Sequence, residues 1–405
     1  MAADIAVTGI GLLTPAGIGI EENWARLLRA EPAAAADPGL AGLPVDFGCR
    51  VPGFDPDEQV GKRLAWRLDR YEQLAMAAAR QAIADSGLDP RTWDGARVGV
   101  VLGTAIGGIG TFEREHTNLR ERGPVEVSSM LIPMLGVNMA AGYIAIDHGA
   151  RGPNFATATA CASGATAIGT AMGLLRSGAC DVVITGGAES SSTPTIVSSF
   201  AKMKALSRNE DPARASRPFD TARDGFVIAE GAGVLVLERA ADAVARGARV
   251  RARLLGYGAS ADAFHATSPH PDGVGATLAI GAALADAGVL PDEVDHVNAH
   301  ATSTPVGDVT EAATLRKVLG ARPVVTSTKG VTGHTLGAAG AIEACFTALA
   351  LQHGVVPPTA NLVDIDPGVD VDVVAGAPRT LPMRVAISNS FGFGGQNAVL
   401  VLAGA

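Results

Sequence analysis

The sequence has few basic residues, no cysteine pairs and no long uninterrupted apolar run, and each absence excludes a class of protein. Its 405 residues include 32 Lys and Arg against 41 Asp and Glu, so the formal net charge is −9. Binding to a phosphate backbone needs a basic surface, and nucleic acid is therefore not an expected partner. No basic segment followed by an apolar stretch opens the chain, so we expect no signal peptide.

The cysteines lie too far apart to form a recognisable metal or disulfide motif. The four are Cys49, Cys161, Cys180 and Cys345, and no two of them fit a Cys-x-x-Cys pattern. This spacing predicts no bound metal and no disulfide framework, and it makes a reducing, cytoplasmic setting the default expectation.

The most apolar segments are too interrupted to cross a membrane. Residues 165–175 and 336–351 are rich in Ala and Gly, and the second segment contains Glu343. Such segments are typical of buried helices, so no membrane is expected as a partner. The chain is 47% hydrophobic and 18% charged and holds 50 glycines, which indicates a compact globular protein with many tight turns. Its length exceeds the size at which one hydrophobic core stops growing, so two core units are expected.

One order of predicted elements occurs twice along the chain. The first part opens with an apolar strand at residues 4–9 and contains a second strand at 181–185. It closes at 224–238, where we expect two strands around a glycine turn. The second part repeats this order, with strands expected from residue 250, at 323–327 and at 384–402, the last again as strand, glycine turn and strand.

Helical patterns separate these strands, at residues 71–86, 163–177, 275–287 and 336–353. Strands that alternate with helices indicate a layered α/β architecture. The matching order of elements favours an internal duplication over two unrelated α/β domains. We expect the two halves to comprise residues 1–245 and 246–405, joined by a charged helix near 239–250.

Cys161 lies among small residues where an extended segment gives way to a helix. Residues 157–164 read TATACASG. A thiol at a helix N-terminus lies at the positive end of the helix dipole, which favours the reactive thiolate. The alternative is a buried structural cysteine, which is how we interpret the other three cysteines.

Two of the eight histidines lie in small-polar, glycine-rich loops after predicted strands. His300 lies in HVNAHATSTPVGD, and Lys329 and His334 lie in TSTKGVTGHTLGAAG. Neutral imidazoles can donate hydrogen bonds to a thioester carbonyl on which negative charge builds, and one of them can handle a proton. Lys329 either fixes their charge state or is neutralised by Glu343. The alternative is a satisfied core or surface histidine, which is how we interpret the other six: His116, His148, His265, His270, His296 and His353.

A glycine-rich segment, NSFGFGGQN at residues 389–397, lies between two predicted strands. Its spacing and position differ from those of a dinucleotide-binding fingerprint, which opens a helix. Glycines here let the backbone turn sharply and present an N–H group to a ligand. Phe391 and Phe393 are either core residues or a movable cover over a pocket, and the flanking glycines favour the cover.

Taken together, four ordered motifs resemble those of the elongating beta-ketoacyl-ACP synthases. The motifs are the segments around Cys161, His300 and Lys329–His334 and the segment NSFGFGGQN, and the similarity extends to VTGIG, SRPFD and DGFVIAEGAG elsewhere in the chain. The closest group is the ketosynthase II type of fatty-acid synthesis, with its relatives in type II polyketide synthesis. The resemblance implies the thiolase fold, a duplicated five-layered αβαβα sandwich, and decarboxylative Claisen condensation without metal or cofactor.

The resemblance also implies roles for individual catalytic residues. Cys161 holds the acyl group, and the backbone N–H groups of Cys161 and Phe393 form an oxyanion hole. His300 and His334 bind the malonyl thioester carbonyl and assist the loss of carbon dioxide. Lys329, paired with Glu343, keeps this site in order.

Substrate-binding positions follow from the same resemblance. Thr302 and Thr304 match contacts to the phosphopantetheine arm, and Ile106 and Leu131 match positions that line the acyl pocket. Phe391 belongs to the expected cover, and Phe393 matches its gate residue. Family members are dimers with the acyl pocket near the dimer interface, so a homodimer or a heterodimer with a chain-length-factor-like subunit is expected.

The implied partner is an acyl carrier protein, which is acidic and docks on a basic patch. The candidate docking residues are Lys62, Arg63, Arg67, Lys202, Lys204 and Arg208, and the alternative is an ordinary solvated surface. Three positions depart from the fatty-acid enzymes: Gly330, Val331 and Gln396. They leave substrate choice open.

Three other functions compete with fatty-acid elongation. The same chemistry could serve a polyene-forming type II polyketide synthase, in a heterodimer with a chain-length factor. A non-catalytic subunit or a decarboxylase that never condenses would typically lack the cysteine. The presence of Cys161, His300, Lys329 and His334 argues against both.

Overall fold

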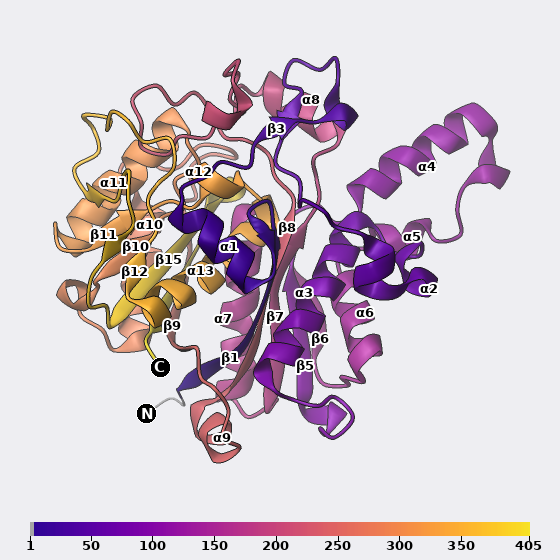
Figure 1. Cartoon of the computed structure of the whole chain (residues 1–405), viewed down its shortest axis with the longest axis horizontal. Helices are drawn as coiled ribbons and strands as arrows, with labels where there is room; N and C mark the ends of the chain where they lie inside the picture. The colour runs from indigo at the N-terminus through magenta and orange to yellow at the C-terminus, as the bar shows by residue number, and fades with distance from the viewer. Residues whose placement is uncertain (1–3) are drawn as a thin grey trace.

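A computed structural model describes residues 4–405, and its main strands form one continuous mixed sheet built from two equivalent halves (Figure 1). The first half has the order β6 (Asn154–Thr157), β5 (Val98–Gly103), β7 (Val182–Glu189), β8 (Gly231–Arg239) and β1 (Ile5–Thr14). The second half has the order β11 (Val324–Thr326), β10 (His296–Asn298), β15 (Val385–Gly392), β16 (Gln396–Ala403) and β9 (Ala252–Ala261).

The two halves match in strand direction as well as in order. In each half the three outer strands run parallel and the two inner strands run antiparallel to their neighbours. The antiparallel pair β1 and β9 joins the halves, and short strands extend them: β2 (Gly17–Ile18) at β1 and β13 (Asp372–Val373) at β11. The expected duplication is therefore confirmed.

Helices form three layers around the two half-sheets (Figure 1). The first outer layer contains α3 (Arg70–Ser86) and α6 (Met139–His148), and the second contains α10 (Val274–Ala287) and α11 (Pro305–Leu319). Between the half-sheets lie α7 (Ser163–Arg176) and α13 (Ala339–His353), which contact each other and strands of both halves. The result is the expected five-layered αβαβα sandwich. No helix within residues 4–405 is long and apolar enough to cross a membrane.

Small residues let the central helices approach closely, which explains much of the glycine and alanine content. A Cβ atom at Gly164 on α7 would lie 2.8 Å from the Ala341 backbone nitrogen on α13, and one at Gly340 would lie 2.9 Å from the Ala165 nitrogen. Because Cβ atoms do not tolerate such contacts, only glycine fits at this helix crossing. The close packing fixes the start of α7, which follows Cys161, against the start of α13, which follows His334.

The predicted helices are confirmed, but one predicted strand is wrong. Residues 224–230 form only isolated bridges, Leu206 with Phe226, Ile228 with His334 and Cys49 with Ala229, instead of the first strand of a hairpin. The apolar pattern of this segment is real, but its partners come from three separate segments rather than from one strand. The bridge between Ile228 and His334 fixes the backbone of His334, whose N–H donates to the Val227 carbonyl at 2.7 Å.

Candidate active site

Cys161 lies in a tight turn at the head of α7. The 3₁₀ turn Ala160–Ala162 begins with Ala160 in a left-handed conformation (φ 48°), which is unusual for a residue with a side chain. This turn aims the thiol away from the central helix and into a cavity of about 690 Å³. Cys161 is only 8% exposed, so a substrate must enter the cavity to reach it.

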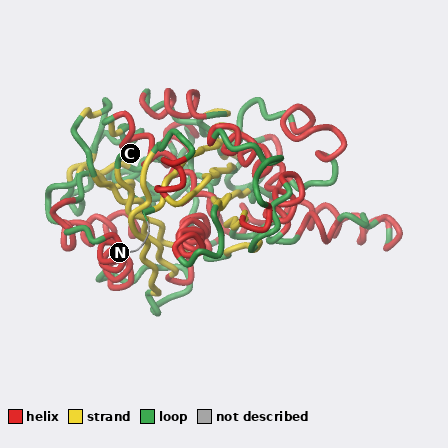
Figure 2. Tube along the Cα trace, turned by 90° about the horizontal axis from the view of Figure 1, so that it is seen from below, coloured by secondary structure: helices red, strands yellow, loops and turns green. Residues whose placement is uncertain are grey.

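Eight of the predicted site residues line this one cavity. They are Ile106, Cys161, His300, Thr302, Thr304, His334, Phe391 and Phe393, and they come from both halves of the chain. Lys329 and Glu343 lie directly behind it, whereas Leu131 does not reach it within one chain. Leu131 begins α5 (Leu131–Leu135), which extends with α4 (Ile109–Arg122) away from the body of the protein (Figures 1 and 2).

The two histidines meet at the thiol. The Nε2 atom of His334 lies 3.1 Å from the Sγ atom of Cys161. The rings of His300 and His334 lie 5.3 Å apart at 84°, and the buried Nδ1 atom of each has no hydrogen-bond partner within residues 4–405. Burial and the nearby Lys329 charge hold the pKa of both imidazoles well below the ordinary value. Both rings are therefore neutral near pH 7 and able to donate a hydrogen bond to a developing oxyanion.

Lys329 and Glu343 form a buried ion pair behind the histidines. The Lys329 Nζ atom donates to the Glu343 Oε1 atom, and the two side chains are 1% and 3% exposed. Burial raises the pKa of Glu343 to about 7 even though Lys329 opposes the shift. The ammonium is the cation that lowers the pKa of both imidazoles, so the pair sets the charge state of the site.

The helix N-terminus favours the thiolate of Cys161, but burial acts more strongly in the opposite direction. Burial raises the pKa of its thiol to about 12, although Lys329 and a hydrogen bond from the Phe393 N–H act in the opposite direction. Desolvation in the enclosed site raises the pKa of the thiol more than the helix N-terminus at the cavity floor lowers it. The resting sulfur is therefore a neutral thiol, and the neighbouring His334 is the group placed to accept its proton.

The glycine-rich loop brings its backbone to the sulfur. Phe393 follows β15, and its N–H group forms a hydrogen bond to the Cys161 sulfur. Gly394 (φ 80°) and Gly395 (φ 69°) then reverse the chain in left-handed conformations that favour glycine. The half-buried Phe393 ring faces Phe200 at 6.3 Å, on one wall of the cavity.

Two residues that hold the site together were missed from the sequence. The buried Glu311 carboxylate accepts the N–H groups of His300 at 2.9 Å and Ala301 at 2.7 Å, which fixes the loop after β10. Arg223 donates to the carbonyls of Thr304 at 3.1 Å and Pro305 at 2.7 Å. The sequence signal for Glu311 is weak, because the buried face of α11 mixes apolar residues with Asp308 and Thr314 as well as Glu311.

The three departures do not line the cavity. A Cβ atom at Gly330 would lie 2.7 Å from the Ala360 carbonyl oxygen, so packing explains this glycine. Val331 is buried in the core, and the half-buried Gln396 lies beside Gly394 at the outer side of the loop. The departures therefore do not alter the walls that a substrate meets.

All six candidate docking residues are exposed. Lys62 and Arg63 lie on α2 (Lys62–Ala65), and the Arg67 guanidinium stacks 4.8 Å from the centre of the exposed Trp66 ring. The others lie in or after α8 (Pro194–Lys202), and among them Lys204 lines the cavity mouth. A basic surface at the mouth suits an acidic partner.

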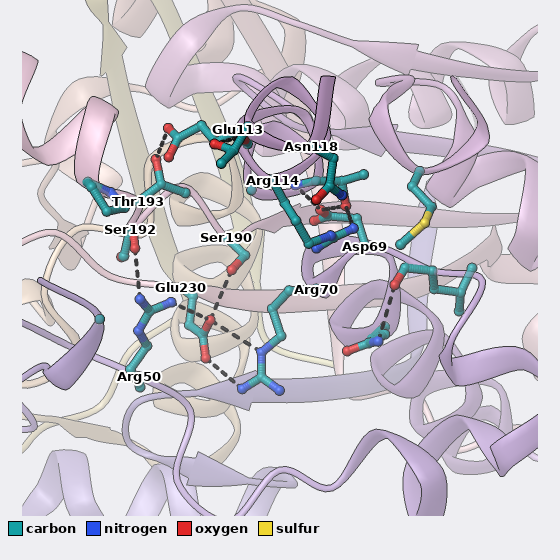
Figure 3. A pocket seen from close by; sticks show the side chains of 18 of the residues that line it. Arg50, Asp69, Arg70, Glu113, Arg114, Asn118, Ser190, Ser192, Thr193 and Glu230 are labelled. Carbon is teal, nitrogen blue, oxygen red and sulfur yellow. Dashed lines mark hydrogen bonds and ion pairs between the residues drawn. The ribbon is translucent and has the colours of Figure 1, made fainter. Parts of the chain in front are cut away.

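A second cavity, of about 840 Å³, lies between α4 and the start of α3 and is filled with paired charges (Figure 3). The buried Glu230 accepts hydrogen bonds from Arg50 at 3.2 Å and Arg70 at 2.7 Å, and Ser190 adds a third at 3.0 Å. These guanidiniums hold the pKa of Glu230 below its ordinary value. Among residues 4–405, no thiol or imidazole lines this cavity.

The donor atoms of Cys161, His300 and His334 lie within 4.8 Å of one another, the one such grouping of possible metal ligands within residues 4–405. The adjacent Lys329 ammonium repels a cation. The same geometry suits proton transfer and oxyanion stabilisation, which need a neutral imidazole beside a thiol.

The fold and this site together define the class of protein, a condensing enzyme of the thiolase fold. The family model described as "Beta-ketoacyl synthase, N-terminal domain" matches residues 2–243, and the model for the C-terminal domain of that family matches residues 251–363. The chain belongs to the beta-ketoacyl synthase family.

Relatives resemble the chain over almost its full length. It is 44% identical over 411 residues to 3-oxoacyl-[acyl-carrier-protein] synthase 2 of Vibrio harveyi, covering 98% of this chain and 97% of the relative. Among solved structures, the ishigamide ketosynthase/chain length factor has a TM-score of 0.93 at 34% identity, with full coverage of both chains. A type II PKS acyl-carrier protein in complex with its ketosynthase bound to the hexaketide has a TM-score of 0.92 at 31% identity, again with full coverage.

Proposed function

We propose that the chain is a 3-oxoacyl-[acyl-carrier-protein] synthase. Cys161 takes an acyl group from a carrier protein and passes it to malonyl-carrier protein with loss of carbon dioxide. The observation that carries this proposal is the 3.1 Å approach of the His334 Nε2 atom to the Cys161 Sγ atom, at the floor of a cavity that His300 also lines. Similarity over the full length to an enzyme of this activity supports it.

The first step is acyl transfer to Cys161. His334 accepts the thiol proton as the sulfur attacks the acyl thioester carbonyl, and the N–H groups of Cys161 and Phe393 stabilise the oxyanion. The carrier thiolate leaves and takes the proton from His334, so the acyl group remains as a thioester on Cys161. Because burial raises the pKa of the resting thiol, deprotonation accompanies attack rather than preceding it.

The second step is decarboxylative condensation. Neutral His300 and His334 donate hydrogen bonds to the thioester carbonyl of the malonyl group, and loss of carbon dioxide leaves an enolate whose oxygen carries the charge. The enolate carbon attacks the acyl carbonyl on Cys161, which forms the new carbon–carbon bond and releases the sulfur. A proton from solvent restores the thiol. Lys329, paired with Glu343, keeps both imidazoles neutral during this step.

Substrate binding is assigned to the walls of the same cavity. Thr302 and Thr304, whose hydroxyl oxygens lie 3.2 Å apart near the mouth, contact the phosphopantetheine arm. Ile106 lines the acyl pocket beside Cys161, and Phe391 and Phe393 cover it. Residues 1–245 and 246–405 form the two functional halves, the first with the nucleophile and the second with both histidines.

The proposed partners are an acyl carrier protein and a second ketosynthase-like subunit. The exposed basic residues at the mouth support carrier docking, and a structural relative is described as a ketosynthase in complex with its acyl-carrier protein. The arm formed by α4 and α5 projects from the body of the protein (Figure 1) and exposes Ile132 (73%) and Val125 (91%). Leu131, at the start of α5, does not line the cavity of its own chain, which favours a dimer in which Leu131 reaches the neighbouring pocket. Either a homodimer or a heterodimer with a chain-length-factor-like subunit fits. We place the enzyme in the cytoplasm, because its four cysteines are all unpaired.

Fatty-acid elongation is the better supported pathway. The relative named as a synthase 2 is 44% identical, whereas the ketosynthase/chain length factor structure is 34% identical. The departures at Gly330, Val331 and Gln396 do not line the cavity and so give no support to a different substrate.

The proposal is tested with the purified chain, acyl-carrier proteins of several lengths and malonyl-carrier protein. We expect intact-protein mass spectrometry to detect a 3-oxoacyl-carrier protein two carbons longer than the acyl donor. A product from the chain alone would also show that no second gene product is needed. If acyl groups load onto the enzyme but no elongated product forms, condensation by the isolated chain is contradicted, and addition of a chain-length-factor subunit then distinguishes the polyketide alternative.

A further inference from the structure

Glu189 is a buried acid next to the active site that the condensation steps do not use. It is the last residue of β7, it is 0% exposed, and it forms no ion pair within residues 4–405. Burial raises the pKa of this carboxyl to about 7. Burial of a carboxyl group without a cationic partner costs free energy, so the position of Glu189 calls for an explanation.

The carboxylate connects two walls of the cavity that holds Cys161. Its Oε2 atom accepts the Ala105 N–H at 2.6 Å, its Oε1 atom accepts the Ser191 hydroxyl at 2.6 Å, and the carboxylate also accepts the N–H of Gly337. Ala105 continues into Ile106 on the acyl-pocket wall. Gly337 belongs to the 3₁₀ turn Leu336–Ala338, which follows His334 and contacts the turn of Cys161.

Space between these walls is so limited that the carboxylate acts as a fixed spacer. A Cβ atom at Gly337 would lie 2.7 Å from the Glu189 Oε2 atom, and Leu336 adopts a left-handed conformation (φ 45°). A residue with a side chain holds that conformation only where its surroundings impose it. The hydrogen bonds from both walls to one carboxylate supply such a constraint.

The negative charge of Glu189 also acts on the nucleophile. Burial raises the pKa of the Cys161 thiol most, Lys329 and the Phe393 N–H lower it, and Glu189 and Glu343 raise it further. The other ionisable groups that face the sulfur are His334, at 3.1 Å, and His300, and both are neutral because burial and Lys329 lower their pKa. Of the charged groups of residues 4–405 around the sulfur, Glu189 alone lacks a cationic partner, because Lys329 and Glu343 pair with each other.

We infer that Glu189 is a positioning residue that holds the Ala105–Ile106 wall against the Leu336–Gly337 turn, and that its charge adds to burial in disfavouring the Cys161 thiolate until a substrate arrives. The wall function rests on the proposed acyl-transfer chemistry, whereas the charge function does not. While Glu189 is ionised, it slows the reaction of the Cys161 thiol with electrophiles other than the substrate. Protonation of Glu189 removes that suppression.

The charge function is tested by the rate at which iodoacetamide alkylates Cys161, measured by intact mass and peptide mapping. Because the pKa of Glu189 is about 7, it is largely protonated at pH 6 and ionised at pH 9. We therefore expect Glu189→Gln to react at the wild-type rate near pH 6 and about threefold faster or more near pH 9. Glu72→Gln is the matched control, since Glu72 is also fully buried but lies on α3 in the outer layer.

Three outcomes would overturn the charge function. They are an equal rate for Glu189→Gln and wild type at pH 9, a rate ratio that does not change with pH, and the same acceleration in Glu72→Gln. If Glu189→Gln fails to fold, Ser191→Ala replaces it. That variant removes one hydrogen bond to the ionised carboxylate, which raises the pKa of Glu189. The pH above which alkylation becomes slower than expected for an isolated thiol must therefore move upward. An unmoved profile contradicts the inference.

The wall function is tested with Glu189→Asp, which keeps the charge but is one methylene shorter. We expect its alkylation profile to match wild type and its relative rates of acyl loading across chain lengths to change by about threefold or more. Unchanged chain-length preference would overturn the wall function. If wild type accepts no acyl group from any carrier protein, the proposed function fails, while the alkylation results still decide the charge function.

Discussion

Replacement of Lys329 by Met is expected to lower the free energy of unfolding by about 3–5 kcal/mol and to abolish condensation, because it leaves the Glu343 carboxylate buried without its partner. Loss of the ammonium also removes the charge that lowers the pKa of His300 and His334. The measurement is urea unfolding followed by circular dichroism, together with the condensation assay.

The double variant Lys329→Met/Glu343→Leu separates stability from catalysis. An apolar pair of similar volume removes both buried charges, so we expect most of the lost stability to return. Condensation should not return, because the histidines still lack the neighbouring cation. A single Lys329→Met variant as stable as wild type would show that the pair is not a structural unit. A double variant with normal activity would show that its charge does not serve the histidines.

Replacement of Cys161 by Ala is expected to reduce product formation by about 10⁴-fold or more and to eliminate the acyl-enzyme. Cys161 is the only cysteine among the described residues that line the cavity with both histidines, so no other thiol there can hold the acyl chain. Cys180→Ala is the matched control, since Cys180 is buried at the end of the first half-sheet and lies outside the cavity. Acyl loading onto Cys161→Ala at the wild-type rate would place the nucleophile elsewhere.

Sequence reasoning found eight residues that line one cavity because each motif is a local segment. Cys161 and His300 lie in short stretches of small residues soon after a strand, and His334 follows a strand and the short helix α12 (Lys329–Thr332). The duplicated order of strands was also readable, since the apolar runs are strong and evenly repeated. What the order could not reveal is that β1 and β9 join the halves into one sheet.

The errors and omissions share one physical cause, which is that burial depends on contacts between distant segments. The helix dipole at Cys161 is local and readable, but the desolvation that outweighs it comes from walls contributed by both halves. Glu189 and Glu311 went unnoticed for the same reason, because an isolated acid in a sequence is usually a surface residue. Residues 224–230 read as a strand because their apolar pattern does not reveal that they bridge three different partners.

The most direct test of this account is a single-turnover chase of the acylated enzyme. The chain is loaded from an acyl-carrier protein, freed of donor, and mapped by mass spectrometry, which should place one acyl group on Cys161. Malonyl-carrier protein is then added alone. The account predicts that the acyl group leaves Cys161 at the rate at which a 3-oxoacyl-carrier protein two carbons longer appears, with one carbon dioxide released per turnover. An acyl group that stays on Cys161 while carbon dioxide is released, or that maps to another residue, would contradict it.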